Sequence, residues 1–164
     1  MITSVKEILE NAQKGGYAVG AFNTTNLETT RAIIDAANEM KSPVIVQITE
    51  KTMEYAGGRA IFNLVKNSAE FYAPEIPIGI HLDHGKSVEI IERCAEIGFP
   101  SVMYDGSRKI FVDNVSVTKE VVEFYRDLVA GSAFSLETAG ALDEGRKVWG
   151  LARSNISRKI LNTR

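Results

Sequence analysis

The 164-residue sequence predicts an α/β fold with a parallel sheet, either doubly wound or part of a (β/α)₈ barrel. Two observations support this prediction. Four short apolar runs alternate with segments whose apolar residues recur at helical spacing, and each apolar run ends on a polar residue. A chain of this length fits one domain that buries about two-thirds of its unfolded surface.

The first elements can be placed from their end signals. Ser4 followed three residues later by Glu7 has the spacing of a capping box and predicts an opening helix, which Gly15 and Gly16 end. The short apolar run 17–22 then predicts the first strand.

Three further strand and helix pairs follow in order. Residues 27–40 predict the helix after the first strand, and residues 43–48 and 61–72 predict the second pair. The later elements are a strand at 78–82, a helix from Val88 that Gly98 closes, a strand at 100–104 and a helix over about 114–129.

The segment after the first strand bears on the choice between the two sheets. A doubly wound dinucleotide-binding fold carries a glycine-rich fingerprint there, whereas this chain has Asn23-Thr24-Thr25-Asn26. In a barrel, polar residues at the carboxyl ends of several strands meet on one rim. Residues of this kind end all four predicted strands: Asn23, Thr49, Asp83 with His84, and Asp105.

Asp83 and His84 are the first candidates for chemistry. An aspartate beside a histidine can be a proton donor next to a metal ligand, or simply a solvated strand end. Asn, Thr and Asp also favour strand ends because they form local hydrogen bonds, so the coincidence of four such ends is the stronger signal. We expect His81, the other histidine, to be buried and hydrogen-bonded.

Composition excludes several classes of function. The net charge is −2 with both signs interspersed, so we expect no nucleic-acid partner. Lys6, Glu7 and Glu10 interrupt the first apolar positions, which argues against a signal peptide or membrane span and for a cytoplasmic protein. Cys94, the single cysteine, is expected to be a small core residue, which is consistent with a reducing compartment.

Several ordered motifs resemble the first half of a known family, the class II, zinc-dependent fructose-bisphosphate and tagatose-bisphosphate aldolases. The resemblance covers residues 1–123 and implies the first four to five βα units of a TIM (β/α)₈ barrel. The motifs are Gly15 to Asn23, Lys41 to Ile45, His81-Leu82-Asp83-His84-Gly85, and Gly98 to Asp105.

The resemblance also implies an activity: zinc-assisted cleavage of a ketose bisphosphate to dihydroxyacetone phosphate and an aldehyde. It implies that Asp83 exchanges a proton with the aldehyde-derived oxygen and that His84 is a zinc ligand. Asp105 matches a carboxylate of the wider metal environment, whereas Thr49 and Asn23 are candidates for binding a sugar phosphate.

The chain departs from the family pattern at the metal site. Relatives have Asp-Ala-Ser-His where this chain has Asp105-Gly106-Ser107-Arg108, and Glu137 can stand for only one of two expected glutamates that contribute to the metal site. A catalytic zinc usually takes three protein ligands, and the chain has two histidines. We therefore expect an incomplete Zn²⁺ site and, with the later strands absent, a truncated chain of weak or no activity.

The segment 127–153 instead resembles an uncharacterised family associated with phages and plasmids. This resemblance predicts an aldolase-like half over 1–123 and a short, divergent tail over 124–164 that is possibly unrelated to the aldolase.

Two other interpretations stay open. The chain could be a non-enzymatic half barrel that binds a metal or a phosphorylated metabolite as a homodimer, or a gene fragment with no function of its own. In either the aldolase or the half-barrel case, unpaired strand edges predict self-association.

Overall fold

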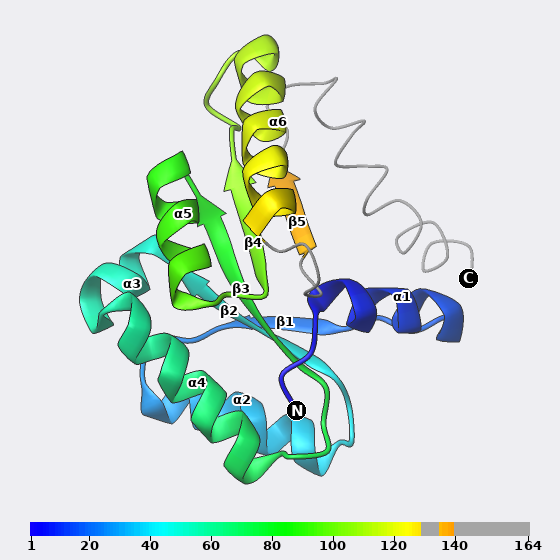
Figure 1. Ribbon diagram of the computed structural model, residues 1–164. Coiled ribbons are helices and arrows are strands. Elements are labelled where there is room, and N and C mark those ends of the chain that lie inside the picture. Colours follow the sequence, from blue (N-terminus) through cyan, green and yellow to red (C-terminus); the bar gives the residue numbers. More distant parts are fainter. Residues whose placement is uncertain (129–134, 140–164) are drawn as a thin grey trace.

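The computed structural model describes residues 1–128 and 135–139, which form one five-stranded sheet with helices (Figure 1). Four of its pairings are parallel and join strands that follow one another in the sequence, in the order β1-β2-β3-β4-β5. The strands are β1 (Gly20–Asn23), β2 (Val44–Thr49), β3 (Ile78–Gly85), β4 (Ser101–Asp105) and β5 (Ser135–Ala139). The helices are α1 (Val5–Gly15), α2 (Leu27–Glu39), α3 (Glu50–Ala56), α4 (Gly58–Tyr72), α5 (Val88–Ile97) and α6 (Phe111–Leu128).

The strand order decides between the two predicted sheets. A doubly wound sheet reverses its strand order part-way, whereas the described strands follow one another without a reversal. The predicted α/β sheet is therefore confirmed, and its order is that of consecutive strands in a (β/α)₈ barrel.

Alternate residues of each strand face two different environments. One face packs on the helices in a core that includes Val46, Ile80, Val102 and Tyr104, all with no exposed surface. The residues between them, such as Gln47 and His81, face the other way, and the pairing register places these two side by side. The second face is where the polar strand ends gather.

Helix α1 stands apart from the layer formed by α2, α3, α4 and α5 (Figure 1). It packs on the second face of the sheet, because a Cβ added at Gly79 would lie 2.7 Å from Val5 and 3.4 Å from Ile8. Glycine at this position lets the helix approach the strand backbone closely.

Two helix starts differ from the prediction. Ser4 precedes α1 as expected, but its side chain caps no backbone N–H, and its buried Oγ has no hydrogen-bond partner among the described residues, so the predicted capping box is wrong. The reciprocal box lies instead at α2, where Asn26 accepts from the Thr29 N–H and Thr29 accepts from the Asn26 N–H. Amide and hydroxyl side chains can perform both roles over the same spacing.

The remaining differences concern lengths. A helix that the apolar pattern did not predict, α3, begins directly after β2, and β3 extends to Gly85. Strand β1 is shorter than predicted, and all four of its residues are exposed, because β2 is its single neighbour among the described strands. Residues 129–134 and 140–164, which hold most of the predicted tail, lie outside the described part.

Candidate functional site

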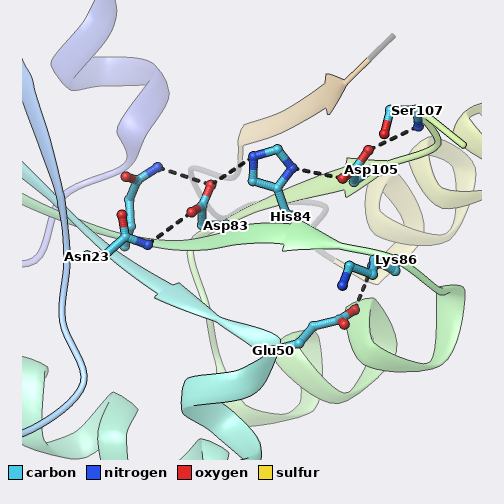
Figure 2. Close-up of polar contacts among 8 residues, drawn as sticks. Asn23, Glu50, Asp83, His84, Lys86, Asp105 and Ser107 are labelled. Carbon is cyan, nitrogen blue, oxygen red and sulfur yellow. Dashed lines mark hydrogen bonds and ion pairs between the residues drawn. The ribbon is translucent and has the colours of Figure 1, made fainter. Parts of the chain in front are cut away.

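The carboxyl ends of β1 to β4 bring the predicted rim residues together. Asn23, Asp83, His84 and Asp105 form a connected row of polar contacts across three strands (Figure 2). The shared rim that the sequence predicts is therefore present, although no contact by itself assigns a role to a residue.

Asp83 is held by two amide side chains. Asn23 Nδ2 donates to one carboxylate oxygen at 3.0 Å, and Gln47 Nε2 donates to the other at 3.4 Å. The Asp83 side chain is 16% exposed, so it is fixed in direction but still reachable from the rim. A carboxylate in this setting can exchange a proton with a bound molecule without first reorienting.

His84 follows in an unusual backbone conformation. Its φ of 59° lies in the left-handed region, which few residues other than glycine adopt, and the register between β3 and β4 shifts between Leu82 and Gly85. A bulge of this kind redirects a side chain. Here it places Nδ1 2.8 Å from Asp105 Oδ2 and Nε2 3.7 Å from Asp83 Oδ1, with 54% of the side chain exposed.

Asp105 determines which nitrogen of His84 carries a proton. Partial burial raises the pKa of the Asp105 carboxyl, but hydrogen bonds from Ser107 and His84 outweigh burial and bring that pKa below its ordinary value. The ionised carboxylate can only accept, so Nδ1–H of His84 donates to it. In the neutral imidazole, the lone pair is then on Nε2, which is the pattern of a histidine available to a cation.

The described side chains do not fit a complete zinc site. Zinc in an enzyme usually takes three protein ligands, and no group of three His, Cys, Asp or Glu residues within the described part could hold a metal ion. His84 supplies one imidazole. Glu137 lies on β5 opposite Met103 in the register, two residues before the partner of Asp105, and its backbone position is all that is described.

Thr49 has a local structural task. It pairs with Asp83 in the register, but its hydroxyl accepts from the Thr52 N–H and so caps α3. Its role in binding substrate stays a prediction, as does that of Asn23.

His81 and Cys94 occupy the positions that the sequence predicts. His81 is 2% exposed and its Nδ1 lies 2.7 Å from Ser101 Oγ, which confirms a buried, hydrogen-bonded histidine. Cys94 has no exposed surface and its Sγ lies 3.6 Å from Met53 Sδ, which confirms a core residue.

Sequence reasoning missed three residues that support the rim. Gln47 clamps Asp83, Ser107 donates its backbone N–H to Asp105, and Glu50 accepts the backbone N–H of Lys86. Gln47 had a visible signal, because it is a polar residue inside the apolar run 44–48. The other two contacts depend on how loops meet in space.

The family assignment follows from comparison with known proteins. The profile of the family "Fructose-bisphosphate aldolase class-II" matches residues 3–133. The chain belongs to the class II fructose-bisphosphate aldolase family. This confirms the resemblance seen in the sequence motifs.

Individual aldolases show how much of the chain is shared. The chain is 46% identical over 124 residues to a fructose-bisphosphate aldolase of Geobacillus stearothermophilus, covering 75% of this chain and 43% of that protein. It is 35% identical over 145 residues to a 6-phospho-5-dehydro-2-deoxy-D-gluconate aldolase of Halalkalibacterium halodurans, covering 88% of this chain and 50% of that protein. The chain thus spans half or less of the length of these aldolases.

The solved structures agree on the architecture. The YdjI aldolase from Escherichia coli K12 superposes with a TM-score of 0.77 at 28% identity, over 92% of this chain and 57% of that one. The structural neighbours are TIM-barrel aldolases, so the predicted partial barrel is confirmed.

A second profile matches the end of the chain. The "Domain of unknown function (DUF932)" matches residues 114–163 and so overlaps the aldolase match over residues 114–133. The predicted resemblance of the C-terminal segment to an uncharacterised family is confirmed. The boundary between residues 123 and 124 stays a prediction.

Within residues 1–128 and 135–139, no helix is both long enough and apolar enough to span a bilayer.

Proposed function

We propose that this chain carries the part of a class II aldolase site that handles the aldehyde end of a sugar phosphate. The observation that carries the proposal is the clamped Asp83, held by Asn23 and Gln47 beside the exposed imidazole of His84. The proposed reaction is the reversible cleavage of a ketose bisphosphate to dihydroxyacetone phosphate and an aldehyde.

In this proposal Asp83 moves the proton that accompanies bond cleavage. The substrate hydroxyl that becomes the aldehyde oxygen gives its proton to the Asp83 carboxylate while the adjacent carbon–carbon bond breaks. The bonding electrons remain with the ketone half as an enediolate, which gives dihydroxyacetone phosphate when its carbon takes up a proton. In the reverse direction, protonated Asp83 returns the proton to the aldehyde oxygen. Asn23 and Gln47 keep the carboxylate aimed at the rim throughout.

We propose Zn²⁺ as the cation that Nε2 of His84 would bind, because Nδ1 is already engaged by Asp105. A bound zinc would polarise the ketone. Since the described side chains supply one imidazole and no complete ligand set, Asp105 and Glu137 remain candidate contributors and no catalytic step is assigned to the metal.

The substrate class and location follow the same proposal. Two aldolases that resemble this chain are named for fructose bisphosphate and for a 6-phospho sugar acid, which supports a phosphorylated sugar without choosing one. A buried free thiol at Cys94 is compatible with the reducing cytoplasm.

Two measurements test the proposal. Cleavage of fructose bisphosphate, coupled to detection of triose phosphate, should be at the limit of detection with added zinc, because the described ligand set is incomplete. Glyceraldehyde 3-phosphate, the aldehyde product, should nevertheless shift the ring NMR resonances of His84, and this shift should weaken in Asp83→Ala but not in the exposed control Glu39→Ala.

The outcomes separate the alternatives. Robust turnover that a chelator and Asp83→Ala both abolish would show that ligands outside the described side chains complete the site. An absence of any His84 shift would overturn the proposed function, and so would measurable turnover that Asp83→Ala leaves unchanged.

A second candidate function rests on the exposed edge strand. All four residues of β1 are exposed, and Phe22 on this strand is 54% exposed. Two copies of the chain that paired through such edges would place two His84 imidazoles on one rim, where they could bind a metal or a phosphorylated metabolite. A monomer in solution with no bound zinc would rule this candidate out.

A further inference from the structure

The turn that carries His84 is held at its far side by a carboxylate from the first residue of a helix, α3. Lys86, two residues after His84, donates its backbone N–H to Glu50 Oε1 at 2.6 Å (Figure 2). Glu50 is the first residue of α3, directly after the end of β2. The contact therefore ties the start of α3 to the loop after β3.

The backbone conformation of this turn is unfavourable in itself. His84 is in the left-handed region at a φ of 59°, where a side chain is disfavoured, so surrounding contacts must hold it there. Gly85 lets the turn lie close against β4, where it pairs with Tyr104, because a Cβ at this position would meet Leu82 at 2.7 Å and the Met103 carbonyl at 3.0 Å. One side of the turn therefore packs closely on β4, and Glu50 holds the other side.

We propose that Glu50 is a positioning residue for His84. By accepting the Lys86 N–H, the carboxylate holds the turn so that one imidazole nitrogen meets Asp105 and the other faces Asp83. A hydrogen bond from a backbone N–H to a carboxylate is charge-assisted and short, which suits a contact that must oppose backbone strain. This inference rests on the proposed role of His84, but its test reads the position of the ring and needs no turnover.

A purely local role for Glu50 would give different results. A carboxylate in the first turn of α3 also stabilises that helix through its dipole. Glu50→Gln removes the charge but keeps an oxygen that can accept the Lys86 N–H. If Glu50 positions His84, Glu50→Gln should leave the His84 ring where it is in the wild type, whereas Glu50→Ala should move it.

The two histidines of the chain make the measurement direct. We expect Glu50→Ala to move the ring resonances of His84, to leave those of the buried His81 in place, and to speed amide exchange at Lys86 about tenfold. Glu50→Gln should restore the His84 resonances. The matched control is Glu54→Ala, which removes an exposed carboxylate from the same helix and should change neither.

The proposal is overturned if Glu50→Ala leaves His84 and the Lys86 exchange rate as they are in Glu54→Ala, or if Glu50→Gln shifts His84 as far as Glu50→Ala does. Should Glu50→Ala also move His81, Glu50→Asp replaces it, because the shorter side chain keeps the charge but cannot reach Lys86. Movement of His84 alone then supports the proposal, and unchanged His84 resonances reject it. Failure of glyceraldehyde 3-phosphate to bind would count against the proposed function and leave these results valid.

Discussion

The hydroxyl of Tyr104 loses its hydrogen bonds to water when the chain folds. Its side chain has no exposed surface, and its hydroxyl is buried without a hydrogen-bond partner within the described part of the chain. Burial raises the pKa of this phenol, so the group stays neutral at ordinary pH. The cost is the loss of the hydrogen bonds that water offers in the unfolded chain.

We therefore predict that Tyr104→Phe raises the free energy of unfolding by about 1 kcal/mol. Urea denaturation measures this change. Tyr55→Phe, which removes a hydroxyl from a side chain that is 79% exposed, is the control and should have no effect. A loss of stability in Tyr104→Phe would mean that the hydroxyl has a partner in solution.

Burial also raises the pKa of a reactive group, the thiol of Cys94. Burial raises the pKa of its thiol to about 12, from an ordinary value of 9.0. Between these values the folded chain keeps a proton that the unfolded chain loses, so the free energy of unfolding should fall as pH rises above 9.0. Replacement by alanine should remove this part of the pH dependence.

At pH 8 we predict that Cys94 reacts with a thiol reagent at least about 100-fold more slowly in the folded chain than in urea, because the nucleophile is the thiolate. Absorbance of the released chromophore follows the reaction. Equal rates in the two states would show that the core around Met53 opens readily.

Among the elements, the helix starts offer a matched pair of mutations. Asn26 caps α2 through a reciprocal box, whereas Ser4 makes no cap hydrogen bond at α1. We predict that Asn26→Ala lowers the free energy of unfolding by about 1 kcal/mol and that Ser4→Ala does not lower it. Thermal or urea unfolding followed by circular dichroism compares the two, and equal losses would contradict the assignment of the cap.

The same helix starts show where sequence patterns succeed and fail. Gly16 ends α1 with a φ of 70°, as its position in the sequence predicts, because the left-handed conformation is a property of the residue itself. Ser4 and Glu7 have the residue types and the spacing of a capping box, but whether the cap hydrogen bond forms depends on how the backbone enters the helix. Ser4 is buried, and in the part of the chain that the structure describes its hydroxyl has no hydrogen-bond partner.

For the whole molecule, the exposed edge at β1 predicts association between copies. Edge strands with apolar side chains invite pairing with another chain, and a charged side chain on the edge opposes it. We predict that the wild-type chain self-associates at micromolar concentration and that Phe22→Lys shifts it toward monomer. Sedimentation velocity measures the distribution.

The control is Phe71→Lys, which places the same charge at a side chain that is 78% exposed on α4. This variant should associate as the wild type does. An equal effect of both substitutions would show that net charge, and not the β1 edge, governs association.

The strands and the row of polar residues at their ends could be predicted from the sequence, whereas the contacts between loops and helices around the site could not. Alternating apolar runs predicted the strands, and their polar ends predicted the row from Asn23 to Asp105, because parallel strands end at a common edge. The contact between Glu50 and Lys86 joins residues 36 positions apart through a backbone N–H, which any residue could donate. A hydrogen bond of this kind leaves no trace in composition or spacing.

Helix α1 covers the second face of the sheet at the amino end of β3. Val5 and Ile8 fill the space over Gly79, near the amino end of β3, while Asp83 lies at the other end of the same strand. A metabolite held by Asp83 would therefore lie away from α1, against the carboxyl ends of the strands and beside the exposed imidazole of His84.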